Sequence, residues 1–175
     1  KSIMTAPRSG RATPRMAETP AGMLNSIGLQ GAGVEEFIRK DLRWLRERGA
    51  RTVVSIAGGS VSEFAELANR LRHEEGIAAI EVNISCPNVE SRGQVFACDA
   101  RAAGSVIHAV RRHTSALTPI FAKLSPDVTD IADIARACVT AGADGLSMIN
   151  TTLGMVIDTD TMRPASWATR AALRN

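Results

Sequence analysis

The stretch EVNISCPNVE, at residues 81–90, places a thiol among amide and hydroxyl side chains directly after an apolar run. Cys86 stands between Asn83 and Asn88 in this stretch. A cysteine in such a setting can act as a general base that removes a substrate proton, or as a nucleophile. The alternative is that Cys86 is a small buried hydrophobic residue, as many cysteines are. Its polar neighbours favour the first interpretation and make Cys86 the candidate catalytic residue.

Four asparagines form a second set of candidates. An asparagine amide both donates and accepts hydrogen bonds, so several amides together suit a neutral ring edged with N–H and C=O groups, such as a pyrimidine or a flavin. For any one of them, the alternative is a turn residue, because Asn is common where the chain bends. The set consists of Asn25, Asn83, Asn88 and Asn150.

Lys123 ends an apolar run in a chain that contains 18 Arg and only three Lys. A compact ammonium group at that position can face a negatively charged intermediate or cofactor ring, or form a Schiff base. The alternative is a structural lysine whose stem packs while its charge reaches solvent. The predicted strand end at Lys123 favours a role in a site.

Eight elements are predicted to position these side chains. Apolar residues at helical spacing indicate helices, β-branched apolar runs indicate strands, and Ser60 with Glu63 has the spacing of a capping box. The predicted helices cover residues 34–48, 60–75, 99–113 and 129–141, and the predicted strands cover residues 52–57, 77–84, 119–124 and 145–150.

This alternation predicts an α/β fold of parallel strands covered by helices, with the strand at 77–84 buried on both faces. Ligand sites in such folds lie at the carboxyl ends of the strands. Ser55, Asn83, Lys123 and the pair Asn150 and Thr151 lie at four such ends, which favours a closed (β/α)8 TIM barrel over an open doubly wound sheet. A barrel takes about 250 residues, so we expect an incomplete barrel of about four βα units.

Composition excludes several other classes. The formal charge is +3, and basic residues alternate with acidic ones, which argues against a nucleic-acid surface. The absence of a long apolar run or a signal peptide predicts a cytoplasmic protein without membrane spans. The three cysteines have no metal-ligand spacing, so no metal site is expected, and we expect Cys98 and Cys138 to be packing residues.

Four segments together resemble the dihydroorotate dehydrogenase family. They are MLNSIGLQ at 23–30, NISCPNV at 83–89, FAKLSP at 121–126 and ADGLSMINT at 143–151. The segment TPRMAETPAGMLNSIGLQ resembles the class 1B catalytic subunit more than class 1A. The resemblance implies an FMN-dependent barrel that oxidises dihydroorotate to orotate in pyrimidine (UMP) biosynthesis.

The same resemblance implies a role for individual residues. Cys86 is then the base that takes the proton from C5 of dihydroorotate while hydride leaves C6 for flavin N5. The implied pyrimidine contacts are Lys1, Asn25, Ser26, Ile27, Gly28, Leu29, Asn83, Asn88, Asn150 and Thr151. The implied FMN contacts are Lys1, Ser2, Ser55, Asn83, Lys123 and Ile149.

The resemblance also implies partners: a subunit that carries FAD and a 2Fe–2S cluster and passes electrons to NAD, and a second copy of the same subunit. It covers residues 1–165, whereas residues 166–175 form a tail that does not resemble the family, so we expect a barrel fragment. Two other functions remain open. One is a reductase of the dihydropyrimidine dehydrogenase type, and the other is a catalytically inert fragment.

Overall fold

The protein is built around a four-stranded parallel sheet. The computed structural model describes residues 2–85, 96–164 and 171–174. The strands follow one another across the sheet in sequence order, and each pair is parallel. They are β3 (Thr52–Ile56), β4 (Ile77–Asn83), β5 (Ile120–Lys123) and β6 (Gly145–Ser147). Parallel neighbours in sequence order require a crossover between each pair, and helices supply it.

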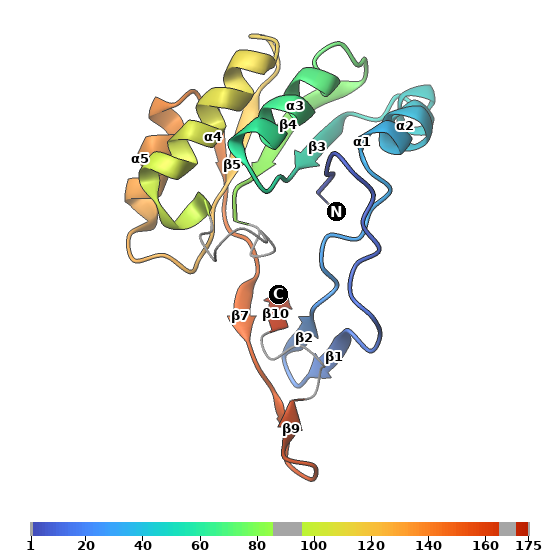
Figure 1. Cartoon of the computed structure of the whole chain (residues 1–175), viewed down its shortest axis with the longest axis vertical. Helices are drawn as coiled ribbons and strands as arrows, with labels where there is room; N and C mark the ends of the chain where they lie inside the picture. The colour runs from blue at the N-terminus through green and yellow to red at the C-terminus, as the bar shows by residue number, and fades with distance from the viewer. Residues whose placement is uncertain (1, 86–95, 165–170, 175) are drawn as a thin grey trace.

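Helices follow the order expected from the sequence, and the longer ones lie over one face of the sheet (Figure 1). The first helical stretch contains a π-helical segment, η1, between two short α-helices. A 3₁₀ turn, η2 (Phe96–Cys98), precedes helix α4. The helices are α1 (Val34–Glu36), η1 (Phe37–Leu42), α2 (Arg43–Glu47), α3 (Val61–Leu71), α4 (Ala100–His113) and α5 (Ile131–Thr140).

Polar side chains cap the long helices, which confirms the predicted starts to within two residues. The Ser60 hydroxyl accepts a hydrogen bond from the Glu63 N–H at 3.2 Å, and the Glu63 carboxylate accepts one from the Gly59 N–H at 2.7 Å. Asp99 and Asp130 cap α4 and α5 in the same way. Each cap satisfies N–H groups that have no partner within the helix.

The core lies between one face of the sheet and helices α3, α4 and α5. Alternate residues of the strands, such as Val54, Ile80, Val82 and Ile120, are almost fully buried there. On the opposite face of β4, Ala79 and Asn83 are also buried and Glu81 is only partly exposed, so the prediction of a strand buried on both faces is confirmed for this part of β4. The opposite face is more accessible on β3, where Val53 is exposed.

A short N-terminal segment extends the sheet beside β3. Ile3 forms a parallel bridge with Ile56, in which the Ile3 N–H donates to the Ser55 carbonyl at 2.7 Å and the Ala57 N–H donates to the Ile3 carbonyl at 2.9 Å. This bridge brings Ser2, near the start of the chain, beside the carboxyl end of β3.

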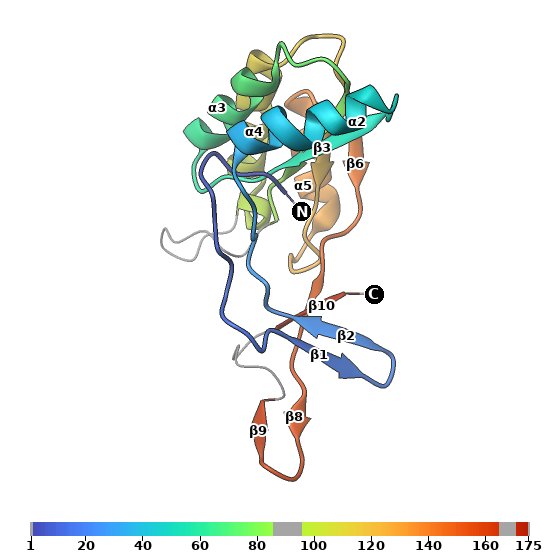
Figure 2. The ribbon, with the colours of Figure 1, turned by 90° about the vertical axis from the view of Figure 1, so that its right-hand side faces the viewer.

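The rest of the chain forms an extended arm below the sheet (Figures 1 and 2). The arm contains an antiparallel sheet in the order β1-β2-β10-β7 and a hairpin formed by β8 and β9. None of these strands was predicted. They are β1 (Met16–Thr19), β2 (Gly22–Asn25), β7 (Thr152–Gly154), β8 (Ile157–Asp158), β9 (Arg163–Pro164) and β10 (Ala171–Arg174).

Candidate functional site

The carboxyl ends of β3, β4 and β5 bring three predicted site residues onto one face of the sheet. Asn83 and Lys123 are register partners on β4 and β5, and Ser55 on β3 is the register partner of Glu81. Because alternate residues share a face, Ser55, Glu81, Asn83 and Lys123 all lie on the face away from α3, α4 and α5. The structure thus confirms the predicted convergence of these strand ends.

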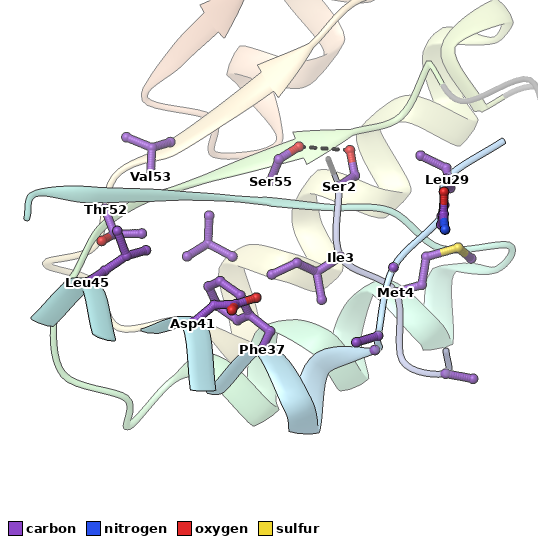
Figure 3. Close-up of a pocket in the computed structure, with 16 residues that line it drawn as sticks. Ser2, Ile3, Met4, Leu29, Phe37, Asp41, Leu45, Thr52, Val53 and Ser55 are labelled. Carbon is purple, nitrogen blue, oxygen red and sulfur yellow. Dashed lines mark hydrogen bonds between the residues drawn. The ribbon is translucent and has the colours of Figure 1, made fainter. Parts of the chain in front are cut away.

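Hydrogen bonds join the side chains of this face to the N-terminal segment. The Ser2 and Ser55 hydroxyl oxygens are 2.9 Å apart (Figure 3), and the Asn83 amide donates to the Ser2 hydroxyl at 2.9 Å. The Asn83 carbonyl oxygen accepts from the Ser85 hydroxyl at 2.8 Å. Ser2, Asn83 and Ser85 are all buried. Buried polar side chains that satisfy one another in this way hold a fixed geometry.

Glu81 is a member of the site that the sequence analysis missed. Its Oε1 atom accepts a hydrogen bond from the Ser55 hydroxyl at 2.8 Å and lies 3.5 Å from the Lys123 ammonium nitrogen. The two charged side chains are 19% and 28% exposed, respectively. Its sequence signal was an acid in an otherwise apolar strand, two residues before Asn83, since acids are seldom buried unless paired.

The segment after β6 joins the same region. The Asn150 amide donates to the Ser85 carbonyl at 3.1 Å, and the Asn150 N–H donates to the Leu124 carbonyl at 2.9 Å. Thr151 follows and is partly buried, whereas Ile149 is 45% exposed. Asn150 is therefore connected to Asn83 through Ser85.

A cavity of about 380 Å³ lies beside β3, next to this group of side chains. Its lining comes from the N-terminal segment, the segment before α1, the first helical stretch and β3 (Figure 3). Ser2, Ser55 and Leu29 border it, whereas Asn83 and Lys123 are not among its lining residues. Of the predicted pyrimidine contacts at 25–29, Leu29 therefore lines the same cavity as Ser2 and Ser55.

The remaining residues of that stretch lie where β2 leaves the arm. Asn25 is buried at the end of β2, and Ser26 donates its N–H to the Arg15 carbonyl at 2.8 Å. The Ile27 carbonyl accepts from the Arg11 N–H at 3.0 Å, and Gly28 has a φ of +65°, a left-handed conformation that favours glycine. The backbone from Asn25 to Gly28 is therefore held by the segment before β1.

Three predicted site residues, Lys1, Cys86 and Asn88, lie outside the described residues. The other two cysteines are described. Cys138 is fully buried, and burial raises the pKa of its thiol to about 11, as expected of a packing residue. The same prediction for Cys98 is wrong, because Cys98 is exposed at the end of η2.

Among the described residues, no group of three or more His, Cys, Asp or Glu side chains is placed to hold a metal ion. No helix in residues 2–85 and 96–164 is long and apolar enough to cross a membrane.

The fold and the position of the polar side chains define the chain as part of an α/β barrel. A solved structure with the same fold is that of DHODH from Eimeria tenella in complex with ferulenol, which matches with a TM-score of 0.68 at 20% sequence identity. The match covers 94% of this chain and 51% of the solved one. This fold match and the four parallel strands confirm the prediction of an incomplete TIM barrel with about four βα units.

The sequence identifies the family. A model of the family described as dihydroorotate dehydrogenase matches residues 1–169, so the chain belongs to the dihydroorotate dehydrogenase family. The catalytic subunit of dihydroorotate dehydrogenase B (NAD(+)) from Geobacter sp. strain M21 is 47% identical over 164 residues, which are 94% of this chain and 53% of that subunit. The corresponding subunit from Desulforamulus reducens is 47% identical over 173 residues, which are 99% of this chain and 56% of that subunit.

The chain spans about half the length of the curated relatives that it matches. The resemblance to the class 1B catalytic subunit is confirmed by these relatives. The division into residues 1–165 and a tail at 166–175 stays a prediction, although the second relative aligns with nearly the whole chain.

Proposed function

We propose that this chain supplies one half of the active site of a dihydroorotate dehydrogenase, the half that faces the flavin ring and the pyrimidine. The observation that supports the proposal is the continuous group of contacts from Lys123 through Glu81, Ser55 and Ser2 to Asn83. It lies at the carboxyl ends of parallel strands, where barrel enzymes carry their sites. The activity belongs to a full-length protein that contains this chain.

The described residues fit the ring of FMN. A flavin ring presents C=O groups and an N–H group along one edge, and the Asn83 amide, the hydroxyls of Ser2 and Ser55 and the Lys123 ammonium offer matching donors and acceptors. Ile149, which is 45% exposed, offers an apolar surface. We propose that these five residues, with Lys1, hold the ring, and FMN when bound would accept the hydride.

The proposed substrate is dihydroorotate. Asn83 and Asn150, linked through Ser85, offer amide groups to the ring edge, and Asn88, Thr151, Lys1 and the stretch 25–29 complete the proposed contacts. Cys86, two residues after the buried Ile84, is proposed as the base that removes the C5 proton. A base at this position would accept the proton from the substrate and then hold it, a role that commonly contributes roughly 10²- to 10⁴-fold to rate.

The relatives are named as catalytic subunits of an NAD(+)-linked enzyme. By analogy, we propose that the full-length protein is of class 1B, pairs with a subunit that carries FAD and a 2Fe–2S cluster, forms a homodimer and acts in the cytoplasm. NAD would then be the final electron acceptor.

The test is ligand binding by a purified full-length protein that contains this chain. FMN is titrated and its fluorescence quenching is measured, and orotate or uracil is then added while the flavin absorbance spectrum is recorded. The proposal predicts stoichiometric FMN and a spectral change with orotate at concentrations where uracil has none. A preference for uracil would indicate a dihydropyrimidine dehydrogenase-type reductase, and the absence of FMN binding would indicate an inert protein.

A further inference from the structure

Glu81 occupies an unusual position for an acid. It is flanked along β4 by the buried Ile80 and Val82, and its register partners are Ser55 on β3 and Phe121 on β5. Its side chain is 19% exposed and lies on the face that carries the candidate site. An acid in such a place costs stability unless its charge is compensated.

The contacts of Glu81 fix the direction of a chain of hydrogen bonds. A carboxylate only accepts, so the Ser55 hydroxyl must donate to Glu81. The oxygen of Ser55 is then left to accept from the Ser2 hydroxyl at 2.9 Å (Figure 3), and the oxygen of Ser2 accepts from the Asn83 amide. Without a carboxylate at position 81, either serine hydroxyl could donate to the other.

This direction decides what the side chains offer to a ligand. Both serine hydroxyl protons are committed, so Ser2 and Ser55 offer lone pairs only. Among the described residues, the second amide proton of Asn83 and the remaining protons of the Lys123 ammonium are then the donors that this group can offer. Lys123 has a flexible four-carbon stem, and the contact with Glu81 at 3.5 Å restricts where its charge lies.

We propose that Glu81 is a positioning residue, which holds the Lys123 ammonium and orients the hydrogen bonds from Asn83 to Ser2 to Ser55, so that the serine lone pairs and the Lys123 charge are fixed where the flavin ring would bind. This inference rests on the proposed function for its ligand, but the positioning itself is a property of the chain. Glu81 acts through Lys123, because the ammonium group is the cation that would face the negative charge of a reduced ring.

The experiment is a double-mutant cycle in the full-length protein that contains this chain. The FMN dissociation constant is measured by fluorescence quenching for the wild type, Glu81→Gln, Lys123→Met and the double variant. Gln keeps an acceptor for Ser55 but removes the charge. We expect Glu81→Gln to weaken FMN binding about tenfold when Lys123 is present and less than twofold when it is replaced by Met. Glu35→Gln is the matched control, because Glu35 pairs with Arg70 on the helices, away from the site, at 2.6 Å.

Glu81→Asp is the conservative variant. Asp keeps the charge and the acceptor on a shorter stem, so we expect binding within about threefold of the wild type. An equal loss of affinity in both Lys123 backgrounds, or equal losses for Asp and Gln, would mean that Glu81 only supports the fold and would overturn the inference.

The same four proteins are unfolded in urea without flavin, which separates this inference from the proposed function. In these unfolding data, we expect the effect of Glu81→Gln on the equilibrium constant of unfolding to differ by at least about threefold between the wild-type and Lys123→Met backgrounds. Coupling without FMN binding by the wild type would overturn the proposed function and leave the positioning in place. FMN binding without coupling would overturn the positioning and leave the proposed function.

Discussion

Asn83→Ala tests whether the buried hydrogen bonds of the site also stabilise the sheet. Asn83 is 6% exposed and makes two side-chain hydrogen bonds, to Ser2 at 2.9 Å and from Ser85 at 2.8 Å. Ala removes both and leaves two buried hydroxyl groups without that partner. Each such group costs about 1–2 kcal/mol, so the free energy of unfolding should fall by about 2–4 kcal/mol.

The assay is urea unfolding of the purified chain, followed by circular dichroism. Ser85→Ala removes only one of the two hydrogen bonds and should cost about 1 kcal/mol. The Asn83→Ala, Ser85→Ala double variant should cost less than the sum, because the two residues share a bond. Asn69→Ala is the control, since Asn69 is exposed on α3 and Ala favours helix. If Asn83→Ala were no more destabilising than Asn69→Ala, the reasoning about this buried network would be refuted.

Three further predictions concern single residues. In a full-length protein that contains this chain, Cys86→Ala should lower dihydroorotate oxidation roughly 10²- to 10⁴-fold while FMN stays bound, with Cys98→Ala as the control; wild-type rates of flavin reduction would contradict the assignment. Burial raises the pKa of the Cys138 thiol to about 11, so the thiol stays protonated in the folded chain at a pH where it ionises in the unfolded chain. The free energy of unfolding should therefore fall between about pH 9 and pH 11, by up to about 1.4 kcal/mol per pH unit. Urea unfolding of Cys138→Ala should show a weaker loss over that range, and an unchanged loss would exclude Cys138 as its source. A Cβ atom at Gly145 would lie 2.6 Å from Phe121 Cε1, so Gly145→Ala should lower the free energy of unfolding in urea by about 1–3 kcal/mol. Gly31→Ala is the control and should cost less, because the nearest atom to a Cβ at Gly31 is the Leu29 carbonyl oxygen, 4.0 Å away. Equal costs would show that the Phe121 ring moves aside freely.

The main sheet and its helices could be predicted because each element has a local signal. Residues 60–75 carry a capping box and a helical apolar pattern, and the strand at 119–124 is a short apolar run that ends at Lys123. The alternation of such elements gives parallel strands, and parallel strands place their carboxyl ends together. The convergence of Ser55, Asn83 and Lys123 follows from that geometry alone.

The arm could not be predicted, because its strands depend on partners far away in the sequence. β10 at 171–174 pairs with β2 at 22–25 and with β7 at 152–154, and no strand of the arm exceeds four residues. Such short segments show no clear alternation of apolar and polar residues. The contact of Ser2 with Ser55 was missed for a similar reason, since it follows from the bridge between Ile3 and Ile56.

Glu81 was missed for a different reason. The run at 77–84 was interpreted as a strand buried on both faces, which leaves no role for an acid. In the structure Ile80 and Val82 lie toward the helices, while Glu81 lies toward the site between the buried Ala79 and Asn83. A single charge in an apolar strand is a signal for a polar partner on a neighbouring strand, here Lys123 on β5.

The most direct test of the central claim is anaerobic reduction of the flavin by dihydroorotate. A full-length protein that contains this chain is purified with FMN, mixed with dihydroorotate without any other acceptor, and followed by loss of flavin absorbance and by chromatography of the product. The account predicts one orotate formed for each FMN reduced. An FMN-loaded protein that dihydroorotate does not reduce would contradict it.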